Sequence, residues 1–82
     1  MLSEYIKAAM HRAKYEILEE DGTIVGTTPE CLGVWANEET LDDCRNELQS
    51  VLEDWILVRI GDHLSLPVIN GIDLNYSKQE VA

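Results

Sequence analysis

The chain has 82 residues, of which 45% are hydrophobic and 27% are charged, and this balance is typical of one small globular domain rather than a disordered segment. Sixteen acidic against six basic residues give a formal net charge of −10, which repels phosphate groups and predicts no direct nucleic-acid binding. The sequence has neither a stretch of roughly 20 apolar residues that could cross a membrane nor the apolar core of a signal peptide, so we expect a cytoplasmic protein without membrane contact.

The first segment has the apolar spacing of an amphipathic helix over residues 2–13. A helix this short is only marginally stable alone, so it must dock on its own sheet or on a neighbouring subunit. We expect one domain over residues 1–82, made of this N-terminal helix (1–13), a core (14–76) and a frayed tail (77–82).

Residues 14–18 and 23–28 predict two strands of a hairpin, because Asp21-Gly22 between them favours a tight turn. Gly26 lies inside the second strand and predicts either a bulge or a close backbone approach. Pro29 cannot donate to a sheet and ends this strand, and the short apolar stretch 33–36 is consistent with a third.

From Thr40 the apolar period changes to three and four, which predicts a helix of about five turns with Thr40 as its N-cap and Gly61 just beyond its end. Its second half, residues 55–60, is apolar almost all round, so it must be covered on two sides. One cover is the sheet, and the other is the N-terminal helix, a second subunit or a partner. The candidate residues for such a protein interface are Tyr5, Met10, Trp55, Ile56 and Ile60.

Residues 66–75 contain Asn70-Gly71 and predict either a hairpin or one edge strand with a turn. The sequence shows no phosphate-binding glycine loop and no nucleophile motif.

The two cysteines are thirteen residues apart, a spacing that matches no common metal or redox motif. Cys44 falls on the helical stripe and is expected in the core, whereas Cys31 follows Pro29 in a turn and is expected to be more exposed. With His11 and His63 the residue types for zinc exist, but their spacings fit no known site. We therefore expect no metal and no cofactor.

Both runs of acidic residues have structural explanations: the three acids at 19–21 keep a hairpin tip solvated, and Asp42-Asp43 balance the positive end of a helix dipole. Nothing places paired carboxylates in a pocket, as general acid–base catalysis requires. We therefore expect that the chain is not an enzyme.

The stretch 29–44 resembles the HicB family of antitoxins. Members typically have a proline followed by an acidic residue, then a glycine, a threonine and an acidic helix start, and later an aromatic or aliphatic stretch, a glycine and an apolar–proline pair. The matching residues in this chain are Pro29, Glu30, Gly33, Thr40, Asp42, Asp43, Cys44, Trp55, Gly61, Leu66 and Pro67. Leu32 departs from the family pattern, which usually has proline there.

The resemblance implies an α+β fold of partial ribonuclease-H-like type: a three-stranded antiparallel sheet, a long helix and a further strand, here with an added N-terminal helix. It also implies a partner, HicA, a small basic toxin that cleaves messenger RNA. Independently of the resemblance, the small size of the chain and the helix that is apolar on two faces predict a homo-oligomer, a dimer or higher. The chain is expected to lack the C-terminal DNA-binding segment of many members. The predicted function is therefore an antitoxin-type protein that neutralises a basic toxin by protein contact, and the alternative is an orphan HicB-like domain that assembles with itself.

Overall fold

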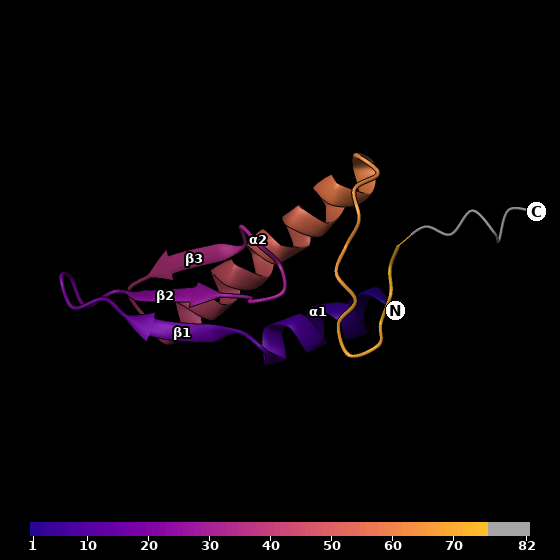
Figure 1. The fold of residues 1–82 in the computed structure, drawn as a ribbon. Coiled ribbons are helices and arrows are strands. Elements are labelled where there is room, and N and C mark those ends of the chain that lie inside the picture. Colours follow the sequence, from indigo (N-terminus) through magenta and orange to yellow (C-terminus); the bar gives the residue numbers. More distant parts are fainter. Residues whose placement is uncertain (76–82) are drawn as a thin grey trace, which may run out of the picture.

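The computed structural model of the chain describes residues 1–75, so the predicted frayed tail at 77–82 and the last residue of the predicted core lie outside the described part. In this described part, one helix, three consecutive strands and a second helix follow one another, which is an α+β order (Figure 1). The elements are α1 (Leu2–His11), β1 (Lys14–Ile17), β2 (Ile24–Thr27), β3 (Trp35–Glu38) and α2 (Leu41–Gly61). This order confirms the predicted fold class as far as the helices and the three antiparallel strands are concerned.

The sheet is a simple antiparallel meander in the order β1–β2–β3. Two hydrogen bonds of 2.8 Å close the β1–β2 turn: the amide of Leu18 donates to the carbonyl of Thr23, and the amide of Gly22 donates to the carbonyl of Leu18. Gly22 has a φ of +72°, which a glycine adopts without strain, so the predicted Asp-Gly hairpin is confirmed.

Gly26 marks a close approach and not a bulge, because the strand register is regular through it. Tyr15 lies opposite Gly26 on β1, and an added Cβ at position 26 would stand 2.9 Å from the Tyr15 ring and 3.1 Å from the sulfur of Cys44. The glycine therefore makes room for an aromatic ring and a helix side chain on the covered face of the sheet.

The third strand begins two residues later than predicted, at Trp35. Gly33 has a φ of +91° and belongs to the preceding loop. In this loop the amide of Cys31 donates to the carbonyl of Thr28, and the amide of Val34 donates to the carbonyl of Cys31. Two successive turns thus occupy residues 28–34, and a strand cannot begin until they end.

The long helix begins as predicted: the Thr40 hydroxyl accepts a 3.1 Å hydrogen bond from the amide of Asp43. Its end was predicted wrongly. Gly61 is still helical, and the left-handed residue is His63, with a φ of +58°. The amides of His63 and Leu64 bond to the carbonyls of Ile60 (3.1 Å) and Arg59 (2.8 Å), which is the Schellman pattern.

After α2, residues 64–75 fold back over the core, and no further strand joins the sheet within the described residues, so the predicted extra strand is wrong. Ile69 and Ile72 form one isolated bridge around a tight Asn70-Gly71 turn, in which both central residues have positive φ. The Asn75 side chain holds this segment together. Its oxygen accepts a hydrogen bond from the backbone amide of Leu66, and its nitrogen donates one to the backbone carbonyl of Leu66.

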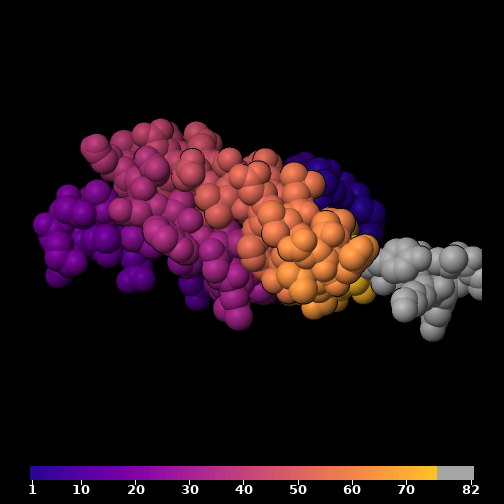
Figure 2. All heavy atoms as spheres, turned by 90° about the horizontal axis from the view of Figure 1, so that it is seen from above, coloured from indigo at the N-terminus to yellow at the C-terminus, as the bar shows by residue number. Residues whose placement is uncertain are grey.

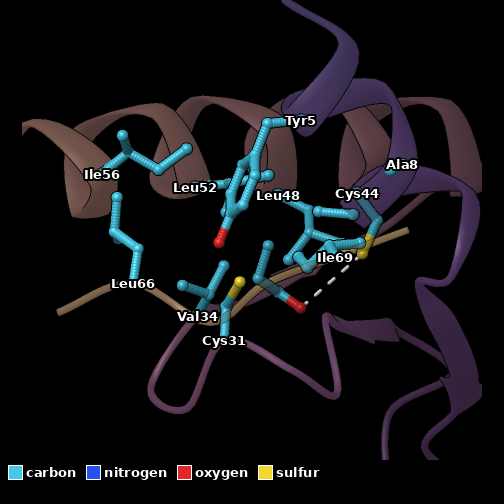
Figure 3. Packing of buried hydrophobic residues seen from close by; sticks show 12 residues of the cluster. Tyr5, Ala8, Cys31, Val34, Cys44, Leu48, Leu52, Ile56, Leu66 and Ile69 are labelled. Atoms are coloured by element: carbon cyan, nitrogen blue, oxygen red, sulfur yellow. Dashed lines mark hydrogen bonds between the residues drawn. The ribbon is translucent and has the colours of Figure 1, made fainter. Parts of the chain in front are cut away.

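The core lies between α2, α1, the loop before β3 and the C-terminal segment (Figure 3). Its α2 contribution is a stripe in which every fourth residue is buried, and Tyr5 reaches into it from α1. The buried hydrophobic residues are Tyr5, Ala8, Ala9, Cys31, Val34, Ala36, Cys44, Leu48, Leu52, Ile56, Leu66 and Ile69. The first half of α2 therefore covers the sheet, whereas α1 and residues 64–75 provide the remaining cover.

Candidate protein-interaction surfaces

The five predicted interface residues separate into three groups. Tyr5 and Ile56 are 0% and 1% exposed, so their prediction as contact residues is wrong: they pack inside this chain. Met10 and Trp55 are half-buried against the core, and Trp55 also lies under the guanidinium of Arg59, whose carbon is 5.1 Å from the ring centroid. Ile60 alone is widely exposed, at 49%.

The residues that carry the family pattern have structural positions. Pro29 and Gly33 lie in the loop between β2 and β3, and Thr40 caps α2. The carbonyl of Pro67 accepts a 2.7 Å hydrogen bond from the Tyr5 hydroxyl. Gly61 has no positive φ, and a Cβ added to it would meet no heavy atom of residues 1–75 within 4 Å, so the described part of the fold does not require a glycine there.

Both thiols are buried, which confirms the core placement of Cys44 and overturns the expected exposure of Cys31. Burial raises the pKa of each thiol above its ordinary value, and the Thr28 and Tyr5 hydroxyls beside Cys31 only partly oppose this. The sulfur of Cys44 also approaches the carbonyls of Ile24 and Ala36. Because the thiolate is the reactive form, neither cysteine is placed for nucleophilic chemistry.

Within residues 1–75, no three His, Cys, Asp or Glu side chains gather into a group that could hold a metal ion. Asp42 and Asp43 are exposed on the first turn of α2 and line neither of two surface hollows. One hollow, of about 480 Å³, separates α1 from α2 and has Lys7, His11 and Arg45 on its walls. Among the described helices, none is long and apolar enough to cross a membrane.

Acidic side chains are concentrated at one end of the molecule. The β1–β2 turn lies beside the β3–α2 junction because Ile24, at the start of β2, pairs with Glu38, at the end of β3. Figures 1 and 2 show this end opposite the end of α2. We call it the acidic end and define it by Glu19, Glu20, Asp21, Glu38, Glu39, Asp42, Asp43 and Glu47.

All but one of these eight side chains are exposed, and Glu38 is half-buried. The Thr23 amide and hydroxyl donate to the Asp21 carboxylate, at 3.0 and 2.7 Å, and this hydrogen bonding holds the pKa of that carboxyl below its ordinary value. Arg45 is the one basic residue between positions 16 and 54, so little positive charge offsets the acidic end.

An apolar surface lies at the other end of α2, where Leu57 and Leu64 are 64% and 48% exposed. Neither residue was among the predicted contact residues, although Leu57 belongs to the region predicted to need a second cover and Leu64 follows it. The signal for Leu57 was its spacing from Ile60, since residues three apart lie on one helix face. Leu64 lies beyond the end of α2, after the left-handed His63, so helical periodicity does not place it.

The sequence profile of the UPF0150-like family matches residues 4–67 of the chain. Among solved structures, the chain is similar to TTHA0281 from Thermus thermophilus, with a TM-score of 0.85 and 32% sequence identity over 93% of this chain and 94% of that chain. A search of curated protein sequences found no match.

Proposed function

Because the chain belongs to the UPF0150-like family, we propose that it is an antitoxin-type binding protein of the HicB kind, which neutralises a small basic toxin by covering its RNA-binding surface. In this proposal the α+β fold is a partial ribonuclease-H-like scaffold that serves protein contact and carries no catalytic carboxylates.

The acidic end is the observation that carries the proposal. A toxin that binds messenger RNA needs a basic surface, and a cluster of exposed carboxylates competes for that surface through the same charges as the phosphates. The carboxylates lie on a rigid support, since the Thr40 cap and the β1–β2 turn are both held by hydrogen bonds. The site thus supplies oriented negative charge and no reactive group.

The direct test is co-expression with the protein encoded beside this gene, followed by affinity capture of the tagged chain. We expect capture of a small basic protein, loss of its toxicity in cells, and release of the complex as the salt concentration rises. Absence of a toxin gene nearby, together with no captured toxin, would contradict the proposal.

A charge-reversal pair tests the surface itself. Glu47→Lys changes the acidic end, whereas Glu16→Lys makes the same change on the strand face that points away from α2. We expect Glu47→Lys to slow toxin association at low salt and Glu16→Lys to have a smaller effect. Equal effects would show that only net charge matters and not the acidic end.

A second candidate is an orphan HicB-like domain that assembles with itself. It is favoured by the exposed apolar residues at the end of α2, which have no counterpart to pack against in the described part of the chain.

A further inference from the structure

The hollow between α1 and α2 is lined mainly by bases where it is charged, although the protein as a whole is acidic. Lys7 and His11 line it from α1, where they lie one turn apart, and Arg45 lines it from α2. The chain has sixteen acidic residues against six lysines and arginines and two histidines. Among the described residues that line the hollow this ratio is reversed, since Glu53 is the one acid. We call the hollow the basic groove and define it by Lys7, His11 and Arg45.

The three bases of the groove are exposed and keep their charge free. Within residues 1–75, neither an ion pair nor a side-chain hydrogen bond involves any of them. Glu4, the acid within one turn of Lys7, lies 2.6 Å from the N-terminal ammonium, and Glu53 accepts a 3.2 Å hydrogen bond from Gln49. These two acids are engaged elsewhere, so the groove retains positive charge that an anion can neutralise.

The two ends of the groove differ in chemistry. The helices α1 and α2 run in opposite directions (Figure 1), so His11 lies toward Arg45 and Ser3 lies toward Glu53. The groove follows each helix for about 12 Å. One end therefore offers positive charge, and the other offers a hydroxyl and a carboxylate that can hydrogen-bond to hydroxyl groups of a ligand.

The dimensions of the groove suit a small molecule. Its volume of about 480 Å³ lies within the roughly 300–1,000 Å³ of ligand sites. Ile6 and Met10, which are half-buried against the core, make part of its wall apolar. A phosphate monoester carries about 1.5–2 negative charges and three strong acceptor oxygens, so it can engage all three bases, whereas a carboxylate carries a single charge.

We propose that the basic groove binds a small phosphate monoester of a hydroxylated molecule, either a sugar phosphate or a nucleoside monophosphate. The phosphate lies between Lys7, His11 and Arg45, and the sugar extends toward Ser3 and Glu53. This site does not rest on the proposed antitoxin function, so the presence or absence of a toxin leaves it unchanged.

A nucleic acid fits the groove less well than a single monoester does. Asp42 and Asp43, at the start of α2, are exposed just before Arg45. A polymer that continued past the basic end would bring further phosphates against these carboxylates, which repel them. The groove therefore accommodates one phosphate and not a chain of them.

Titration of the full chain followed by two-dimensional NMR tests the proposal, with ribose 5-phosphate and adenosine 5′-monophosphate as probes at constant ionic strength. We expect saturable shifts of backbone amides in α1 and in the first half of α2, with dissociation constants below about 1 mM. Tighter binding of the nucleotide would identify a nucleoside monophosphate, and binding of ribose 5-phosphate that is at least as tight would identify a sugar phosphate.

Inorganic phosphate is the control ligand. It should bind at least about tenfold more weakly, because it lacks the hydroxyl groups that reach the far end of the groove. Equal affinity for inorganic phosphate would overturn the proposed orientation, and shifts that do not saturate by about 10 mM of either probe would overturn the site.

Matched charge removals locate the phosphate. Lys7→Gln and Arg45→Gln should each raise the dissociation constant of ribose 5-phosphate at least about fivefold, because each loses a charge-assisted hydrogen bond. Lys14→Gln is the control, since it removes the same charge from an exposed residue on the strand face that points away from α2. Equal weakening by the control would show that only net charge matters and would refute the groove. Unchanged urea midpoints would confirm that all three variants keep the fold.

Discussion

Replacing Tyr5 by phenylalanine removes one hydroxyl from the centre of the core. Tyr5 is fully buried, and its hydroxyl donates a 2.7 Å hydrogen bond to the carbonyl of Pro67, 62 positions along the chain. This bond joins α1 to the segment that follows α2. The substitution keeps the ring and its packing, so it isolates the contribution of the hydroxyl.

At neutral pH two figures bound the stability that this substitution removes. A typical hydrogen bond contributes about 0.5–1.5 kcal/mol, and deleting one partner so that a buried carbonyl is left without a donor costs about 1–3 kcal/mol. We expect Tyr5→Phe to lower the free energy of unfolding by about 1–2 kcal/mol, which for a domain of this size lowers Tm by about 4–16 °C.

The effect should depend on pH in a defined way. Burial, followed by the nearby Cys31, raises the pKa of Tyr5 from 10.0 to about 12. The folded state therefore holds the phenolic proton more tightly than the unfolded state does. The stabilisation is complete below pH 10 and is lost as the pH rises towards 12, by about 2–3 kcal/mol. Wild type should thus lose its advantage over Tyr5→Phe in this window, and the order of stability should reverse.

Urea denaturation followed by circular dichroism from neutral pH to pH 12 measures this difference. A difference between wild type and Tyr5→Phe that stays constant over the whole range would refute the buried, protonated hydroxyl. The matched control is Tyr15→Phe, because the Tyr15 hydroxyl is buried without a hydrogen-bond partner among the described residues. Its removal should be neutral or stabilising, and an equal cost for both variants would show that the Pro67 bond is not the cause.

Four further outcomes test the local structure by urea denaturation. Gly61→Ala should raise the free energy of unfolding by about 0.5–1 kcal/mol, since this glycine is helical. A lower free energy of unfolding would mean that Gly61 lies just beyond the helix end, as the sequence predicted. Gly26→Ala should destabilise by about 1–3 kcal/mol, because the new Cβ would stand 2.9 Å from an aromatic ring; an unchanged midpoint would contradict that close approach. Thr40→Ala should cost about 1 kcal/mol through loss of the N-cap, whereas Thr40→Asp should restore it. The hydrogen bond from Arg12 lowers the pKa of Glu30 below its ordinary 4.5. The stability that wild type gains over Glu30→Gln should therefore be complete above pH 4.5 and disappear as the pH falls below that value. A stability advantage of wild type that persists in acid would exclude the carboxylate as its source.

The features that sequence predicted well depend on neighbouring residues. The Thr40 cap needs only the amide three positions on, and the Asp21-Gly22 turn needs only the two residues that close it. The end of α2 shows the limit of such local rules. Gly61 satisfied the residue preference for a C′ position, but it remained helical and His63 adopted the left-handed conformation.

The candidate surfaces were less predictable, because exposure depends on what covers a residue. Tyr5 and Ile60 both follow an apolar helical pattern, yet one is fully buried and the other is half exposed. The difference arises from the segment after α2, whose Leu66 and Ile69 reach the core and whose Pro67 accepts the Tyr5 hydroxyl. No periodicity within a helix reports a contact made across 62 positions.

The sequence by itself determined the composition of the two ends of this protein: an excess of acids up to residue 54 and an apolar run after it, together with the order of helices and strands. Only the tertiary structure decided which of those apolar side chains remain exposed. Packing against the sheet, α1 and residues 64–75 uses one side of α2, and the last turns extend past that cover, so the opposite side presents Leu57 to solvent. Local chemistry specifies where a helix forms, whereas the free faces of that helix are set by distant segments that the chain brings back to it.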